Sequence, residues 1–548
     1  MNLNKLVIII LFSTGSVFGQ DIGITEVKIL EGFKPVISKA SKLNENATFA
    51  DTIKKDRTQV YDILDVKLKS HYKIKPLSAA KVKDDKIPFL YGTEIGVGFG
   101  SAFETKVDVL YNSKRSKSFT YGIMASHFAN KYSFAKNSNN EMFFYGKSIS
   151  SSYVFFADLE YSRRTAFYQD PEINLIDKQF LRNRFAYTKF SITALSKQDN
   201  PQAISHRTHL FVSDLNEFSE NQIHLSSNIK KVINDVSTSW YLKFDDYFNY
   251  YNDSDFEKKD VRFFAFSPSI LIKENGFDVD LGADISLVSS ESKMSFFPMI
   301  KIEKELVEGI ILVNAGLRNI KHRHTLKKLS DKNPYIHSFG MNQSLIDNQA
   351  FVQDLKFSER KELYFSIRNV LSKGEIFESI ATYSNVKNFA HFIRYDLPSY
   401  HRFQVNYLDL KEFHLKLNYD KRINELINLE ITLDYFEWDK DVYNKSNYIV
   451  GFRVPFRLRD KLKVVSSLNY LSKRKVLNYY LLDDLDVSNT FSQDLSAQFF
   501  INLSFHYFYS KQLSAFLELN NITNTQKYFW DGYYQLGFNG LVGVNYSF

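Results

Sequence analysis

The stretch Gly-Leu-Val-Gly-Val-Asn-Tyr-Ser-Phe, residues 540–548, alternates between two kinds of side chain. Every second residue is apolar or aromatic: Val542, Val544, Tyr546 and Phe548. The residues between them are small or polar: Gly543, Asn545 and Ser547. Because successive side chains of a β-strand point to opposite faces, this pattern predicts a strand with one apolar face and one polar face.

The same alternation appears in segments far from this one. It is clear in residues 277–286, 427–436 and 495–508, where apolar side chains alternate with small, polar or acidic ones. A half-buried strand in a soluble sandwich has the same pattern, so a single segment does not separate the two kinds of fold. The number and spacing of the segments must do so.

From Phe89 to Phe548 we count about 22 alternating segments, which is within the range of strand numbers in membrane barrels. Turn-like clusters separate them, for example at 273–276, 371–374 and 459–461. Longer connections fall on every second junction, the longest at about 321–360, as in barrels with short periplasmic turns and longer outer loops. The predicted fold class is all-β, a transmembrane antiparallel up-and-down β-barrel of about 22 strands.

The composition excludes several other classes of protein. Aromatic residues make up 16% of the 548 residues, which is too many for a disordered chain. After the first twenty residues, the sequence has no apolar run of about 18 residues that would form a membrane-spanning helix. Cysteine is absent, so we expect neither disulfides nor thiolate metal sites. The net charge of +8 is not gathered in a basic stripe, so we expect no nucleic-acid binding.

The N-terminal residues differ from the rest of the chain. A basic start, an apolar core at 6–12 and small residues before Gln20 predict a secretory signal peptide over residues 1–19. Residues 20–88 are rich in lysine and weakly patterned, so we expect a short irregular segment that is either periplasmic or partly fills the lumen. The barrel is then expected over residues 89–548, in the outer membrane of a Gram-negative cell.

The closing hairpin carries a family resemblance. Residues 513–524 end in Asn-Asn-Ile-Thr-Asn, and aromatic segments at 528–530 and 532–534 lead to the last strand, which ends at Phe548. This order resembles the last hairpin of TonB-dependent receptors, and segments 362–369 and 459–462 resemble a short, divergent group of such receptors from Bacteroidetes-type bacteria. The resemblance implies a barrel of about 22 strands with a filled lumen. It also implies that the barrel-assembly machinery binds the terminal strand.

The sequence departs from that family at its N-terminal side. The family carries a plug domain much longer than residues 20–88, preceded by a short box that binds the energy-transducing partner. We find no convincing box, and we expect the chain to lack a complete plug of its own. A plug-bearing protein or a TonB-type energy-transducing protein is therefore an expected partner, together with outer-membrane lipid.

Two function classes remain open from the sequence. The first is a receptor-like barrel that takes up an unidentified solute across the outer membrane. The second is a structural or partner-docking barrel without transport. An outer-membrane hydrolase is the least favoured alternative, because no nucleophile with an oriented base stands out by its spacing. We therefore expect no enzyme activity, no catalytic residue and no cofactor.

Charged residues on the polar faces of the predicted strands are the candidate site residues. We expect these side chains to line the lumen: Asp278, Asp280, Asp284, Arg368, Lys416, Glu430, Asp434 and Glu518. The simpler interpretation is a solvated, salt-linked interior in which bases such as Lys106 balance the acids. The functional interpretation is an acidic lining along a solute path, where side-chain changes would alter selectivity.

Three histidines near the longest loop were considered as metal ligands. His322 and His324 are two residues apart, and His337 follows them in the chain. Two histidines without a third ligand at fixed spacing are common by chance, so we interpret this segment as a solvated loop and expect no metal site.

Overall fold

The computed structural model describes most of the chain from residue 91 onward. The described ranges are 91–114, 116–132, 135–168, 182–197, 203–215, 220–249, 260–290, 294–336, 355–397, 400–480, 489–525 and 528–548. The predicted signal peptide over 1–19 and the predicted segment over 20–88 lie outside the described residues.

Strands dominate the described residues. The first thirteen strands are β1 (Thr93–Gly100), β2 (Thr105–Asn112), β3 (Phe119–Tyr132), β4 (Ala135–Ile149), β5 (Tyr153–Phe167), β6 (Arg182–Ser196), β7 (Ser205–Leu215), β8 (Glu220–Ile233), β9 (Val236–Asn249), β10 (Val261–Glu274), β11 (Phe277–Val288), β12 (Ser295–Val307) and β13 (Ile311–Arg323). After the helix α2 (Leu326–Lys332) come β14 (Phe357–Ser372), β15 (Glu375–Leu397), β16 (Tyr400–Arg422), β17 (Asn428–Trp438), β18 (Tyr448–Leu458), β19 (Leu462–Leu471), β20 (Arg474–Tyr480), β21 (Asn489–Leu495), β22 (Gln498–Phe508), β23 (Leu513–Asn520), β24 (Tyr528–Trp530), β25 (Tyr533–Tyr534) and β26 (Asn539–Ser547). Among the residues described, no helix is long and apolar enough to cross a membrane.

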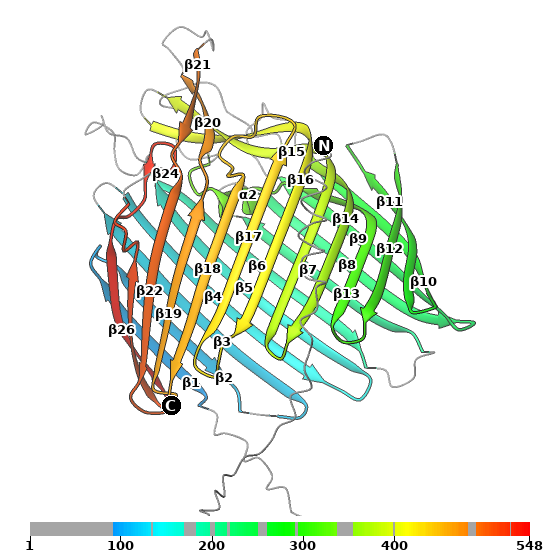
Figure 1. The fold of residues 1–548 in the computed structure, drawn as a ribbon, viewed down its shortest axis with the longest axis horizontal. Coiled ribbons are helices and arrows are strands. Elements are labelled where there is room, and N and C mark those ends of the chain that lie inside the picture. Colours follow the sequence, from blue (N-terminus) through cyan, green and yellow to red (C-terminus); the bar gives the residue numbers. More distant parts are fainter. Residues whose placement is uncertain are drawn as a thin grey trace, which may run out of the picture. The chain divides into compact units, whose positions relative to one another are not determined.

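Twenty-two of the described strands close into one antiparallel barrel (Figure 1). Strands β1 to β19 pair in the order of the sequence, and β22, β23 and β26 continue the wall. The ring closes where β26 pairs with β1, from Glu94↔Ser547 to Gly100↔Leu541. This confirms the predicted fold class and the predicted strand number.

The two ends of the barrel differ in the length of their connections. We call the end where β1 begins and β26 finishes the turn end, and the opposite end the loop end. At the turn end, β10 and β11 are joined by Asn275 and Gly276, which both have positive φ, as a two-residue hairpin turn requires. At the loop end, the connection between β13 and β14 spans 324–356 and includes α2. This agrees with the predicted long connection at 321–360.

The hairpin β20–β21 stands outside the barrel ring at the loop end (Figure 1). It pairs in parallel with the end of β15, from Arg394↔Asn478 to Asp396↔Tyr480. The sequence pattern predicted one strand over 495–508, which is wrong at its start. Leu495 ends β21, and β22 begins only at Gln498, because the chain turns between the hairpin and the wall.

The wall has an apolar face and a polar face, as the alternation predicts. Ring closure places Val542, Val544 and Tyr546 beside Phe99, Val97 and Ile95 of β1, and all six side chains are exposed. Asn545 and Ser547 lie on the other face, where the Ser547 hydroxyl donates a hydrogen bond to Glu94. A closed barrel with an exposed apolar outer band is the form in which strands span a membrane, which gives a transmembrane β-barrel.

Candidate functional site

The polar faces of β17, β18, β19, β22 and β23 line one concave surface, which we call the inner pocket. It encloses a cavity of about 480 Å³, and its lining is mixed in charge and rich in amides. Charged and titratable members of the lining are Glu430, Arg453, His506 and Glu518, and its amides are Asn469, Asn502 and Asn520. Five strands supply these residues through the period-two rule, because every second side chain of each strand faces the same side.

Two of the predicted lumen acids belong to the inner pocket. Glu430 of β17 accepts from Arg453 of β18 at 2.8 Å, in a pair that stands opposite in the strand register. Glu518 of β23 lies 3.3 Å from Lys106 of β2, so this pair spans the β26–β1 closure. The structure thus brings these two acids to one surface, each already paired with a base.

Three more predicted acids lie on β11, outside the inner pocket. Asp278 pairs with Lys273 across the β10–β11 turn at 2.7 Å. Asp280 stands opposite Lys301 of β12 in the register. Asp284 is buried and accepts hydrogen bonds from Ser267 at 2.9 Å and from Asn319 at 3.1 Å.

The remaining predicted residues lie on β14 to β17. Arg368 pairs with Glu378 of β15 at 3.1 Å, and both side chains are about half exposed. Asp434 accepts from His414 Nε2 at 2.8 Å and stands opposite Lys416 in the register. Among the described residues, all of these candidates except Asp280 and Lys416 form a hydrogen bond or ion pair with a side chain of another strand. The salt-linked interpretation describes these contacts better than a continuous acidic path.

A folded layer of loops packs over the inner face at the loop end. Its core is made of buried side chains from strands and from loops: Tyr168, Phe185, Leu215, Leu326, Leu329, Ile336, Phe392, Phe403, Val405, Trp530 and Tyr533. Tyr335 stacks on Tyr533 with ring centroids 3.6 Å apart, so the long connection after β13 packs directly on the β24–β25 hairpin. We call this structure the mouth layer.

Polar contacts bind the mouth layer to the wall. Asn183 of β6 and Tyr168 both donate to the carbonyl of Ile336, at 3.0 Å each. Arg394 of β15 pairs with Asp531 of the β24–β25 turn at 2.7 Å, and both side chains are less than a tenth exposed. Buried ion pairs of this kind are costly to break on one side only, so each fixes the position of a loop.

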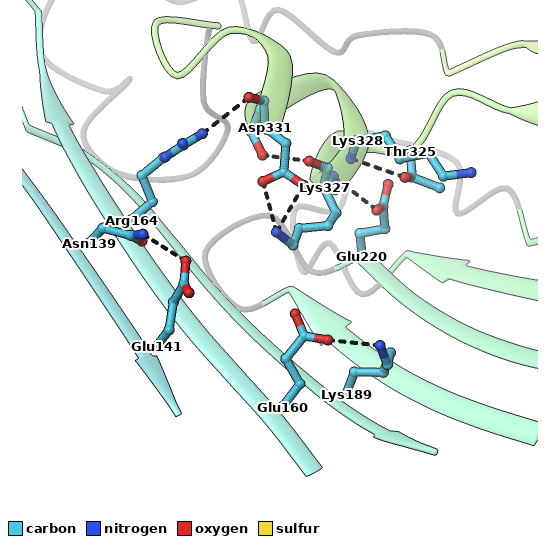
Figure 2. A network of polar contacts seen from close by, with 11 residues as sticks. Asn139, Glu141, Glu160, Arg164, Lys189, Glu220, Thr325, Lys327, Lys328 and Asp331 are labelled. Atoms are coloured by element: carbon cyan, nitrogen blue, oxygen red, sulfur yellow. Dashed lines mark hydrogen bonds and ion pairs between the residues drawn. The ribbon is translucent and has the colours of Figure 1, made fainter. Parts of the chain in front are cut away.

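The helix α2 is held by a carboxylate from the wall (Figure 2). Glu220 of β8 accepts from the backbone N–H of Leu326 at 2.8 Å, and Thr325 caps the helix by accepting from Lys328. Arg164 of β5 donates to the carbonyl of Asp331 near the other end of the helix. Because both helix ends are satisfied by protein groups, α2 can lie in the mouth without exposing its backbone.

Several titratable groups of the mouth layer are perturbed by burial. Burial raises the pKa of Tyr335 to about 12 and lowers the pKa of His324 to about 4. Lys445, in the loop between β17 and β18, has its pKa lowered to about 8 by burial and by the nearby cations Lys332 and Arg360. Its ammonium lies 4.9 Å from the centre of the Phe389 ring. Burial at the loop end therefore shifts the protonation of Tyr335, His324 and Lys445.

The described residues contain no cluster of three or more histidines or acids able to hold a metal ion. The rings of His322 and His324 lie 5.0 Å apart, and His324 is hydrogen-bonded to the carbonyl of Asn388 at 3.2 Å. His337 lies outside the described residues. The inner pocket also contains a serine, a histidine and an acid, namely Ser504, His506 and Glu518. Glu518 forms its ion pair with Lys106.

The mouth layer is not predicted from the sequence. The segment 325–332 carries a helix signal, with Thr325 before the helix and Leu326 and Leu329 three residues apart, whereas the histidine pattern beside it predicts a solvated loop. Tyr533, in the aromatic segment 528–534, packs on Tyr335, and this contact joins segments far apart in sequence and has no local signal.

Solved structures share this fold. The ferric enterobactin receptor PfeA of Pseudomonas aeruginosa superposes with a TM-score of 0.60 at 10% identity, over 83% of this chain and 80% of that chain. The siderophore receptor PirA of Acinetobacter baumannii gives 0.59 at 11% identity, over 84% and 81%. FpvA of P. aeruginosa, bound to pyoverdines, gives 0.59 at 11%, over 84% and 72%.

No protein-family model and no curated protein matches the chain. At 10 to 11% identity the likeness shows the fold. That fold agrees with the resemblance in the closing hairpin, where Asn521 of the Asn-Asn-Ile-Thr-Asn turn donates to the carbonyls of Thr525 and Leu536 and so braces the aromatic loop. The chain shares the fold of these receptors, a closed antiparallel β-barrel.

Proposed function

We propose that this barrel takes up a polar solute across the outer membrane as a receptor and not as an open pore. The observation that carries the proposal is the mouth layer, whose buried core covers the inner face at the loop end. A barrel of 22 strands encloses far more space than its inward side chains fill, and left open it would make the membrane leaky. A solute must therefore displace folded loops before it reaches the wall below.

The inner pocket supplies the chemistry of solute contact. Paired charges of both signs and several amides offer hydrogen bonds without a strong net field. Such a lining suits a neutral or zwitterionic polar solute, which can exchange hydrogen bonds with Asn469, Asn502 and Asn520 while the ion pairs remain in place. The structural neighbours include siderophore receptors.

The segments outside the described residues complete the proposal. Residues 1–19 would direct export, and residues 20–88 would form a periplasmic or partially lumen-filling segment. A plug-bearing or TonB-type energy-transducing protein would complete the closure. The barrel-assembly machinery would bind the terminal strand that contains Val542, Val544 and Tyr546.

Planar-bilayer conductance tests the proposal. The intact protein should give a low conductance, deletion of residues 21–85 should raise it, and Asp531→Ala, which loosens the mouth layer, should raise it further. The matched control is Lys473→Ala, because Lys473 pairs with Asp494 at an exposed site of the loop end. Unchanged conductance in both altered proteins, together with a stable copurifying complex and no solute flux, would favour a partner-docking barrel instead.

A further inference from the structure

The wall is interrupted between two strands that are neighbours in sequence. Strands β12 and β13 pair from Val307↔Ile311 up to Ile300↔Leu317, and the register stops there. Both strands nevertheless continue toward the loop end: β12 stays paired with β11 as far as Ser295, and β13 stays paired with β14 as far as Arg323. We call the stretch between Ser295–Met299 and Arg318–Arg323 the lateral seam.

Two prolines on β12 and β10, at the level of the lateral seam, explain part of the interruption. Pro298 of β12 stands opposite Ala283 of β11. On the other side of β11, the β10–β11 register passes from Phe266↔Ile285 to Ser269↔Gly282 and omits Ser267 and Pro268, although Pro268 still stands opposite Trp240 of β9. Proline has no N–H to donate, so it is found at strand edges or irregularities and weakens pairing on both sides of this part of the wall.

The faces of β13 explain the rest. Its lipid-side residues run Ile311, Val313, Ala315 and Leu317, which are apolar. The next residues on the same side are Asn319, Lys321 and Arg323. Charged side chains on a lipid-facing strand are destabilising, so the wall cannot continue outward along this strand beyond Leu317.

The polar part of β13 lies behind the neighbouring wall. Asn319 donates to Asp284 of β11 at 3.1 Å and to Glu359 of β14 at 3.3 Å. Ser295 of β12 donates to Glu359 at 3.1 Å, and the Lys361 ammonium lies 5.7 Å from the centre of the Phe297 ring. Past Leu317, side chains rather than backbone hydrogen bonds thus join the two sheets. The backbone edge of Ser295–Met299 faces this seam.

The two sides of the seam differ sharply in chemistry. Outside it, the exposed apolar residues are Phe264, Leu287, Met294 and Phe296, the last two more than 60% exposed. Behind it, Ser286 Oγ and Asn319 Oδ1 are buried without a hydrogen-bond partner among the described residues. An open strand edge is tolerated at membrane depth only where it is buried in protein or lines a polar cavity.

We propose that the lateral seam is a side opening that admits the head group of an amphiphile from the outer leaflet, while its acyl tail rests on Phe264, Leu287 and Phe296. The head group would be neutral and bear hydroxyls. Hydroxyls can serve the unpaired Ser286 and Asn319 atoms. The charged side chains at the seam already have partners or other interactions: Asp284, Arg318, Lys321, Arg323, Glu359 and Lys361. This inference concerns the wall and goes beyond passage through the mouth.

Photolabelling in lipid vesicles tests this opening. The probe is an alkyl glucoside that carries one diazirine in its tail and a second diazirine on its sugar. The tail group should label Phe264, Leu287 and Phe296, and the sugar group should label residues behind the seam, such as Asn319. An excess of unlabelled alkyl glucoside should reduce the inner labelling several-fold, whereas an alkyl phosphate should not. Labelling of the outer side chains alone would mean ordinary lipid contact and would overturn the proposal.

Closing the seam provides the matched comparison. The chain has no cysteine, so Ser295→Cys with Glu359→Cys can be bridged by a short bifunctional thiol reagent. The control is Asn314→Cys with Ser366→Cys, which stand opposite each other in the fully paired β13–β14 register. Bridging the seam should abolish the inner label and leave the outer label, and bridging the control pair should change neither. If the variant Ser295→Cys with Glu359→Cys fails to fold, Pro298→Val is the alternative, because it restores a backbone N–H donor to β12 and should lower the inner labelling. Equal inner labelling in all variants would refute the opening.

Discussion

The turn end and the loop end of this barrel are stabilised in different ways. At the turn end, connections such as Asn275-Gly276 are short, and ion pairs such as Lys273–Asp278 are exposed to water. At the loop end, aromatic and aliphatic side chains form a buried core, and the buried Arg394–Asp531 pair binds the β24–β25 turn to β15. Interactions between residues close in sequence thus stabilise the turn end, whereas packing between segments distant in sequence stabilises the loop end. Substitutions at the two ends should therefore differ in size and in kind.

The largest effect is expected at the loop end. Asp531→Ala would leave the Arg394 guanidinium buried beside an apolar side chain, which typically costs about 3–5 kcal/mol for a buried pair. The cost should appear as undocking of the β24–β25 hairpin, measured by limited proteolysis within 525–538, while the barrel remains folded. The exposed pair Lys473–Asp494 gives the control, since Asp494→Ala should leave proteolysis unchanged. Equal cleavage in both variants would mean that burial does not distinguish this end.

The wall between the two ends gives the next effect. Val544 is exposed on the apolar face, so Val544→Lys should cost about 2–4 kcal/mol if it lies near the bilayer midplane, and less toward an interface. Asn545→Lys places the same charge on the polar face and should be mild. Urea unfolding in lipid vesicles measures both. Equal losses at the two positions would show that the alternation does not separate lipid from lumen.

Features of the turn end could be predicted from the sequence, whereas the packing of the loop end could not. Alternation and turn chemistry act between neighbouring residues, which is why the strand number and turns such as Asn275-Gly276 could be predicted. The sequence offers a salt-linked lumen only as one of two interpretations and names no ion pair, and the contact of Glu518 with Lys106 joins strands far apart in the chain. The contact of Tyr335 with Tyr533 could not be, because it joins segments about 200 residues apart and no periodicity records such a contact.

A pH effect is expected at the loop end, where Lys445 is buried. The pKa of Lys445 falls from 10.5 to about 8 in the folded protein, so the unfolded chain binds more protons between these values and stability rises with pH across that window. Lys445→Met removes the group. The melting temperature of this variant should exceed that of the parent at pH 7, and the excess should shrink from pH 8 to 10.5. A constant difference over that range would contradict the assignment.

The smallest effect is expected at the turn end, where Lys273 and Asp278 form a 2.7 Å pair with side chains 67% and 37% exposed. Water competes for both groups, so Lys273→Ala should cost less than about 1 kcal/mol. That cost should vanish at about 1 M salt, where the screening length falls to about 3 Å. Urea unfolding at low and high salt measures it. Asp531→Ala should keep its effect at high salt, because salt screens a buried pair much less. A loss of stability in Lys273→Ala that does not depend on salt would mean that packing stabilises the turn end.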